Sequence, residues 1–135
     1  MTPRIHLAMD NCFAFKRYTQ PDDWAQVIAS LGLRYVEASA DTELDPLYMG
    51  VPYLRDWALR VKEAEARHGV RVCNLYSGHG TYTTLGLTHT DQRVRDRMVA
   101  DWFFPMIQMA GGLDCGMGFF AHAFHHRFLS PQART

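Results

Sequence analysis

Apolar residues along this chain alternate between short continuous runs and longer stretches with a single apolar face. The runs at residues 4–9, 33–38, 70–75 and 113–120 have the length and composition of buried strands. In the stretches between them, apolar side chains recur at spacings of three and four residues, which is typical of amphipathic helices. The pattern therefore predicts four strands with a helix between each consecutive pair.

The predicted helices have recognisable beginnings and ends. Proline suits the first helical turn, serine and threonine cap helix starts, and glycine suits the left-handed position that ends a helix. On this basis the three helices run from Pro21 to Gly32, from Pro52 to Gly69, and from Thr90 to Gly111–Gly112. Pro105 is expected to kink the third helix. Residues 41–50 and 76–90 are expected to be loops, and a loop as long as the second is often functional.

Regular alternation of strands and helices predicts an α/β fold with parallel strands and right-handed crossovers. One such fold is half of a (β/α)8 barrel, with sequential strand order 1-2-3-4. A small open, doubly wound sheet is the alternative, and a reversal in strand order would identify it. The length of 135 residues suits a single domain, 1–135, which would be incomplete as a barrel because eight βα units need about 250 residues.

Composition narrows the function classes. Apolar residues make up 47% of the chain, enough for a sizeable core, and 14 basic residues balance 14 acidic ones. A balanced surface offers no electrostatic reason to propose nucleic acid or an anionic membrane as a partner. No apolar run is long enough to span a membrane, and the first ten residues do not resemble a signal peptide.

The three cysteines, Cys12, Cys73 and Cys115, are odd in number and far apart in sequence. They form no CxxC pair, which argues against a zinc knuckle or a disulfide framework. A reducing, cytoplasmic location is therefore expected.

Two polar residues occupy equivalent places in the predicted strands. The similar segments that begin at Gly32 and Gly69 bring Glu37 and Asn74 to the same position, near the carboxyl end of a strand. Active sites of parallel α/β folds lie at that end. A carboxylate after an apolar strand is costly unless it is paired or hydrated. Glu37 is therefore the leading catalytic candidate, and an ordinary solvated acid at a strand end is the alternative.

The first strand adds two candidates for substrate binding. Residues of one parity along a strand share a face. Ile5, Leu7 and Met9 are expected to face the helices, which leaves His6 and Asp10 facing the barrel interior. For His6, the role of an interior histidine with satisfied hydrogen bonds is favoured over a catalytic one.

Two further histidines follow predicted strands. His79 lies between Gly78 and Gly80, and flanking glycines allow the backbone to approach a ligand closely. His122 follows the last strand and is four residues before His126, a spacing that could present two imidazoles to a metal on a helix. Both histidines could equally be solvated loop residues.

Taken in order, these segments resemble the N-terminal half of the xylose isomerase-like TIM barrels, a family of sugar isomerases and epimerases that also includes endonuclease IV. The matching segments are Ile5–Ala8, Gly32–Glu37, Gly69–Val72 leading to His79, and Gly111–Gly112 leading to His122. The resemblance covers nearly the whole chain and about half of the family's fold.

The resemblance implies a divalent metal (Mn, Mg or Zn) and a proton or hydride shift next to a sugar carbonyl. It would place Glu37, His79 and His122 around a small carbohydrate at the strand ends. By analogy with the endonuclease branch, His79 and His122 could alternatively bind zinc. In the sugar branch most metal-binding carboxylates come from later strands, so the ligands are mostly expected beyond residue 135.

A half barrel would leave two sheet edges unpaired and an apolar inner face exposed. The sequence therefore predicts either a fragment with little activity alone or a chain that pairs with a second copy. Such a homodimer could be non-catalytic.

Overall fold

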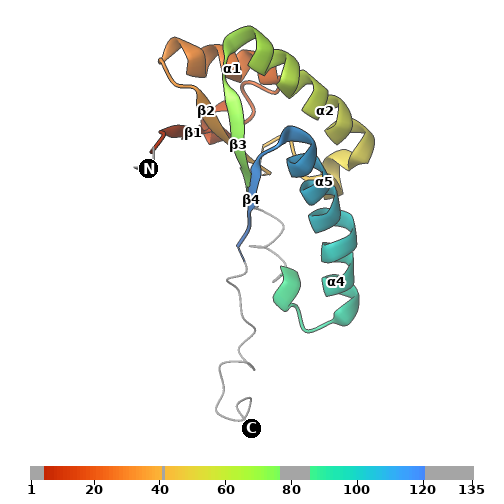
Figure 1. Ribbon diagram of the computed structural model, residues 1–135. Helices are drawn as coiled ribbons and strands as arrows, with labels where there is room; N and C mark the ends of the chain where they lie inside the picture. Colours follow the sequence, from red (N-terminus) through yellow and green to blue (C-terminus); the bar gives the residue numbers. More distant parts are fainter. Residues whose placement is uncertain (1–4, 41, 77–85, 121–135) are drawn as a thin grey trace.

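The computed structural model describes residues 5–40, 42–76 and 86–120, and they form one α/β unit (Figure 1). Its sheet has four strands: β1 Ala8–Asp10, β2 Tyr35–Ser39, β3 Arg71–Tyr76 and β4 Gly116–Gly118. All pairs are parallel and the order is β1-β2-β3-β4. Both the predicted α/β class and the predicted sequential strand order are confirmed.

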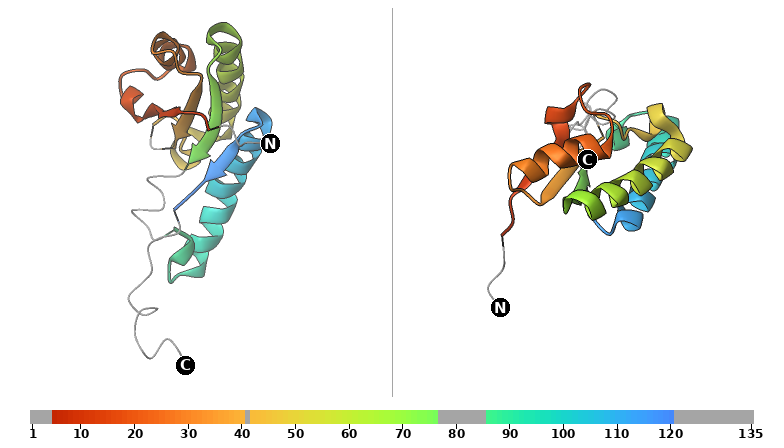
Figure 2. Two further views of the ribbon diagram at one scale, coloured as in Figure 1. Left: turned by 60° about the vertical axis from the view of Figure 1, so that its left-hand side comes forward. Right: turned by 90° about the horizontal axis from the view of Figure 1, so that it is seen from above.

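The helices form an arc along one side of this sheet (Figure 2). The longer ones are α1 Pro21–Ser30, α2 Pro46–His68 and α5 Phe104–Leu113. Helix α4 Gln92–Arg97 leads into a π-helical segment, η3 Met98–Phe103, which continues into α5. The short 3-10 helices η1 Asn11–Ala14 and η2 Gly86–Thr88 lie in connections. No helix in the described ranges is long and apolar enough to cross a membrane.

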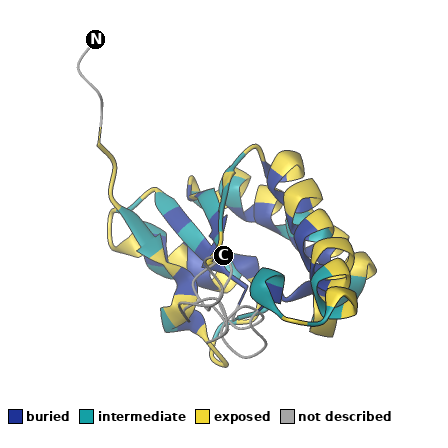
Figure 3. Ribbon diagram, turned by 90° about the horizontal axis from the view of Figure 1, so that it is seen from below, coloured by how far each residue is buried: buried dark blue, intermediate teal, exposed yellow. Residues whose placement is uncertain are grey.

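The core lies between the sheet and this arc of helices. Strand residues with almost no exposed surface, such as Val36 and Leu75, meet equally buried Trp57 and Met106 from the helices. Figure 3 shows buried residues on the helix faces that point toward the sheet and exposed residues on the opposite faces. Burial of each large apolar side chain stabilises the fold by about 1.5–3 kcal/mol. This packing holds in place the sheet that carries the polar residues described below.

Helix α2 begins earlier than the sequence predicts. Residues 46–50, predicted to be loop, are helical because Asp45 caps them by accepting a hydrogen bond from the Leu47 N–H at 2.9 Å. Gly50 has φ 75° and ψ 157° and separates this first turn from the main helix, which contains Pro52. The predicted end is confirmed, since Gly69 adopts the left-handed conformation at φ 69°.

The third helical region also differs at both ends. Its cap is Asp91 rather than Thr90, because the Asp91 carboxylate accepts from the Arg93 N–H at 2.9 Å. At the other end the predicted stop at Gly111–Gly112 is wrong: α5 continues to Leu113, and Asp114 takes the left-handed position. Pro105 lacks the N–H that would continue the regular bonding pattern, and the π-helical segment lies directly before it.

Strands β1 and β4 are shorter than predicted. Because β1 begins only at Ala8, Ile5 and Leu7 are not covered by helices and are 95% and 72% exposed. Their expected position against the helices is therefore wrong, whereas Met9 packs against the core as expected.

Strand β3 contains an irregularity that matters for the site. Val36 pairs with Val72 but Glu37 pairs with Asn74, so Cys73 is an extra residue without a partner on β2. A bulge of this kind shifts the alternation of faces along a strand. Val72 and Leu75, three residues apart, are both buried against the helices. Asn74 and Tyr76 are consequently on the other face of the sheet.

Candidate functional site at the carboxyl ends of the strands

Four residues form one row across the sheet, one from each strand. Asp10 pairs with Glu37, Glu37 with Asn74, and Asn74 with Gly116. Neighbours in a sheet register place their side chains on the same face. The row thus brings together two carboxylates and one carboxamide, as the alignment of Glu37 with Asn74 in the sequence predicts.

The Glu37 carboxylate is held by its neighbour in the row. The Asn74 Nδ2 group donates a hydrogen bond to Glu37 Oε1 at 2.6 Å. Both side chains are partly buried, so the contact is only partly screened by water. One carboxylate oxygen is fixed by this bond, and the other has no partner among the described residues. Glu37 is therefore oriented, and within the described part of the chain its second oxygen is open to a ligand.

The Asp10 carboxylate is held by a different set of neutral groups. Its Oδ1 accepts from the Cys12 N–H at 2.7 Å, and its Oδ2 accepts from the Tyr76 hydroxyl at 2.5 Å. The Cys12 Sγ lies 3.4 Å from the same hydroxyl. Burial, and then the hydrogen bond to Asp10, raise the pKa of Tyr76 well above its usual value. Tyr76 is therefore a neutral hydrogen-bond donor at physiological pH.

These groups line an open hollow of about 550 Å³ at the carboxyl ends of the strands. Its remaining walls are Gly118, Phe119 and Phe120. The Phe119 ring contacts the Phe103 ring edge to face, with centroids 4.9 Å apart, so helix segment η3 supports the aromatic wall. The hollow therefore combines hydrogen-bond acceptors at one side with aromatic surface at the other.

Neither carboxylate is neutralised by a basic side chain in the described part of the molecule. The ion pairs found there involve other acids, namely Asp22, Asp91, Asp101 and Asp114. Two acids held side by side only by neutral donors make the described lining of the hollow net negative. Hydroxyl groups, which donate hydrogen bonds, suit such acceptors.

The described residues do not gather enough ligands for a divalent metal. Within ranges 5–40, 42–76 and 86–120, no three histidine, cysteine or carboxylate side chains come together in a way that could hold an ion. Asp10 and Glu37 alone do not make the oxygen-rich shell that Mg²⁺ or Mn²⁺ requires. The described residues by themselves therefore do not fit a metal centre.

The histidines singled out in the sequence are not part of this row. His6 is exposed and its ring lies 4.9 Å from that of Tyr35, at the opposite end of β2 from the hollow. It is not among the residues that line the hollow. His79 and His122 lie outside the described residues, and their proposed substrate and metal roles stay predictions.

Sequence reasoning missed Tyr76 as a site residue, because it placed this residue at the start of a loop. The signal that could have identified it is its position two residues after Asn74, on the same face of an extended strand. Cys12 also contacts the site, through its backbone N–H to Asp10 and its Sγ to the Tyr76 hydroxyl, and its sequence spacing indicates neither contact.

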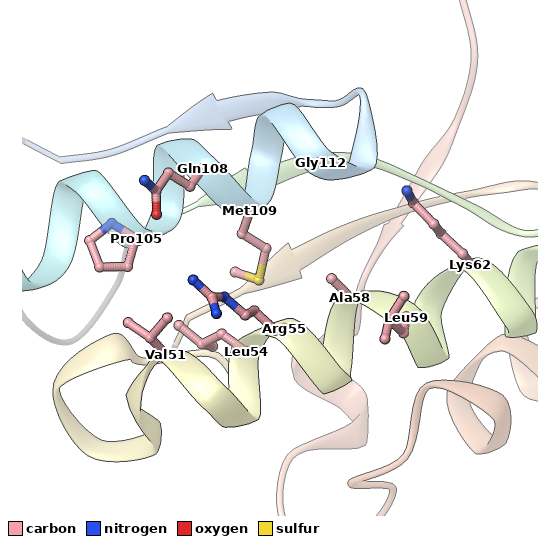
Figure 4. A pocket seen from close by; sticks show the side chains of 10 residues that line it. All are labelled: Val51, Leu54, Arg55, Ala58, Leu59, Lys62, Pro105, Gln108, Met109 and Gly112. Carbon is pink, nitrogen blue, oxygen red and sulfur yellow. The ribbon is translucent and has the colours of Figure 1, made fainter.

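A second hollow lies far from this chemistry, on the outer side of the molecule (Figure 4). This groove of about 340 Å³ runs between α2 and α5. Its apolar lining includes Val51, Leu54 and Met109, and Arg55 and Lys62 are its cations. It contains no acid and no pair of groups suited to proton transfer, so it is not a candidate active site.

Comparison with known proteins gives a fold match. No protein-family model matches the chain, and no curated protein has a matching sequence. Among solved structures, a "Putative Xylose isomerase" from Rhodospirillum rubrum superposes with a TM-score of 0.79 and 22% identity over 97% of this chain. The match spans only 44% of that protein's length. The chain has the fold of half a TIM barrel.

The half barrel agrees with the sequential strand order and argues against the open, doubly wound alternative, which requires a reversal. It also explains where the hollow lies, because TIM-barrel sites are built at the carboxyl ends of the strands. At 22% identity the likeness establishes the fold, and the activity has to be argued from the site.

Proposed function

We propose that the strand-end hollow binds a small carbohydrate, as part of an isomerase or epimerase that moves a proton next to the sugar carbonyl. The observation that carries this proposal is the row of Asp10 and Glu37, two carboxylates fixed by neutral donors and free of ion pairs in the described chain. The half-barrel fold, shared with a protein named as an isomerase, supports it.

In this proposal the residues of the hollow have different roles. Glu37 has one oxygen fixed by Asn74 and one available, which suits a general base that takes a proton from carbon or from a hydroxyl. Asp10 and the neutral Tyr76 hydroxyl orient substrate hydroxyl groups by accepting and donating hydrogen bonds. Phe119 offers an apolar surface to the C–H face of a sugar ring. Together they bind, orient and deprotonate a polyol.

A divalent metal (Mn, Mg or Zn) in such an enzyme would polarise the carbonyl and hydroxyl oxygens. The described residues do not form a group able to hold this metal, so they support no step that passes through it. We therefore expect the 135-residue chain to bind sugars weakly but not to turn them over. Metal-dependent conversion of a ketose by the purified chain would contradict this expectation.

The binding proposal is tested by titrating the ¹⁵N-labelled chain with a panel of aldoses and ketoses, with and without Mg²⁺ or Mn²⁺. We expect saturable shifts confined to residues of the hollow, and a loss of about tenfold in affinity for Glu37→Gln, since a hydrogen bond to a charged group is worth about 1.5–3 kcal/mol. Arg55→Gln in the outer groove is the matched control and should bind normally. Absence of saturable shifts with every sugar would refute the proposal.

A second candidate function, a half barrel that pairs with a second copy, is favoured by one observation. The exposed apolar residues Ile5 and Leu7 adjoin strand β1, and β1 has a strand on only one side within the described sheet. Light scattering at several concentrations tests it: a stable dimer that Leu7→Asp dissociates supports pairing, and a monomer throughout rejects it. The free state of all three cysteines is consistent with the cytoplasmic location proposed for either function.

A further inference from the structure

Two glycines of β4 lie directly against the Asn74 side chain. A Cβ atom added to Gly116 would lie 2.9 Å from Asn74 Oδ1, and one added to Gly118 would lie 3.4 Å from Asn74 Nδ2. The first distance is shorter than real Cβ contacts, and the second is tight. The carboxamide therefore occupies the space that side chains on β4 would fill.

Backbone conformation does not explain these glycines. The positive-φ glycines among the described residues are Gly32, Gly50, Gly69 and Gly86, and neither β4 glycine is one of them. An alanine could adopt the backbone angles of Gly116, so the constraint at this position is space. The atom that restricts this space belongs to the same carboxamide whose Nδ2 group donates to Glu37 at 2.6 Å.

We propose that Gly116 is a positioning residue for Glu37: the side chain it lacks gives Asn74 room to lie across β4 and hold the carboxylate. This inference rests on the proposed function in one respect only, namely the ligand on which Glu37 acts. Glu37 and Gly116 do not touch through the register, because β3 separates β2 from β4. Gly116 affects Glu37 through the Asn74 side chain and its hydrogen bond to the Glu37 carboxylate.

A methyl group added at Gly116 would make its closest contact with the carboxamide itself, at 2.9 Å from Asn74 Oδ1. At the other end of the amide, Asn74 Nδ2 is bonded to Glu37 at 2.6 Å and lies 3.4 Å from the Cβ position of Gly118. The Cys73 carbonyl lies 3.5 Å from the Cβ position of Gly116, an ordinary contact that does not need to move. A methyl group at Gly116 therefore acts mainly on Asn74, and turning its amide away removes the hydrogen bond to Glu37. Gly118→Ala should act in the same direction but more weakly.

The first test needs no ligand. In ¹H–¹⁵N spectra, the side-chain amide signals of Asn74, assigned with Asn74→Ala, should move in Gly116→Ala and move less in Gly118→Ala. Gly112→Ala is the matched control, because its added Cβ meets no atom within 4 Å. Asn74 signals that stay in place in Gly116→Ala would overturn the proposal.

The second test separates positioning from simple structural damage. Gly116→Ala should lower the urea midpoint of the wild-type chain but should lower it little further in an Asn74→Ala chain, since the clash then has no second partner. Affinity for whichever sugar the wild-type chain binds should fall about tenfold in Gly116→Ala and should not recover in the double variant, because the donor to Glu37 is still missing. If Gly116→Ala lowers the midpoint as much in the Asn74→Ala background as in the wild type, the methyl group acts on the strand itself, which also overturns the proposal.

The two proposals can fail separately. If the wild-type chain binds no sugar, the proposed function fails, and the amide signals and the urea midpoints still decide the role of Gly116. If sugar binds and the Asn74 amide signals do not change in Gly116→Ala, only the positioning role of Gly116 is refuted.

Discussion

The strand-end hollow and the outer groove are both sizeable concave surfaces, yet they differ in how their polar groups are held. In the hollow, each carboxylate has a dedicated donor: Asn74 for Glu37, and Tyr76 for Asp10. In the groove, Arg55 and Lys62 form no ion pair within the described residues, and the rest of the lining is apolar except for Gln108.

Concave shape and apolar character therefore do not distinguish the proposed site from other hollows of this fold. The groove is the gap left where two helices pack side by side, so its lining is continuous with the core. The hollow is formed where four parallel strands end, so its lining comes from groups that the sheet register aligns. Pre-oriented polar groups are what a catalytic site requires.

Leu54→Ala should have the largest effect and should affect stability alone. Leu54 lines the groove but is only 4% exposed, so removing its side chain leaves a cavity in the core. We expect a loss of about 2–5 kcal/mol in the free energy of unfolding, measured by urea denaturation. Any sugar affinity of the hollow should be unchanged under conditions where the variant is folded. A selective loss of sugar binding would place the ligand in the groove and end the distinction between the two regions.

Asp10→Asn should have an intermediate effect, centred on Tyr76. The carboxylate accepts a hydrogen bond from the Tyr76 hydroxyl at 2.5 Å, and its charge disfavours tyrosinate. In Asp10→Asn the pKa of Tyr76 should therefore fall toward its usual value without reaching it, because burial remains. Absorbance titration of tyrosinate measures this, with Tyr76→Phe identifying the signal among six tyrosines. We expect a cost in stability of about 1 kcal/mol. A Tyr76 titration identical to that of the wild type would show that the contact is absent in solution.

The same residue predicts a smaller effect of pH on stability. The pKa of Tyr76 is raised in the folded protein, so the folded state keeps this proton more tightly than the unfolded state. The resulting stabilisation is complete below the unfolded pKa of about 10 and is lost as the pH rises above it. Urea midpoints measured from pH 8 to 11 should therefore decline less steeply in Tyr76→Phe than in the wild type. Parallel declines would contradict the assignment.

The smallest effects are expected on the exposed side of the groove. Leu59 is 61% exposed and Arg55 has no ion-pair partner in the described chain, so Leu59→Ser and Arg55→Gln should each change stability by less than about 0.5 kcal/mol. Thermal or urea denaturation measures this. A larger loss from Leu59→Ser would mean that something covers this face in solution.

Much of the fold could be predicted from the sequence because it follows from local patterns. Apolar runs and helical spacing gave the element order, and the repeated glycine lead-ins aligned Glu37 with Asn74, which the sheet register confirms. Boundaries were less predictable where two signals compete. Asp45 and Pro52 both suit a helix start. In the structure Asp45 caps a first helical turn, Pro52 lies in the main helix, and Gly50 separates the two.

The site was predictable only in part, because its contacts depend on register between strands far apart in sequence. The Asp10–Tyr76 hydrogen bond joins residues separated by 66 positions, and nothing local to Tyr76 indicates it. Neither does the sequence show that Gly116 faces Asn74, because that contact depends on the register between β3 and β4. The catalytic role of Glu37 stays a prediction on which the binding experiment bears.

The extra residue in β3 has a consequence for how such chains should be aligned with one another. A chain without Cys73 would keep its apolar content and its strand propensity. Beyond the missing residue, however, the amide and the phenol would turn toward the helices, and Leu75 would turn toward the hollow. The ability to hold Asp10 and Glu37 therefore depends partly on the number of residues in β3. A sequence alignment that closes this one-residue gap would still match the fold but would misplace the residues of the site.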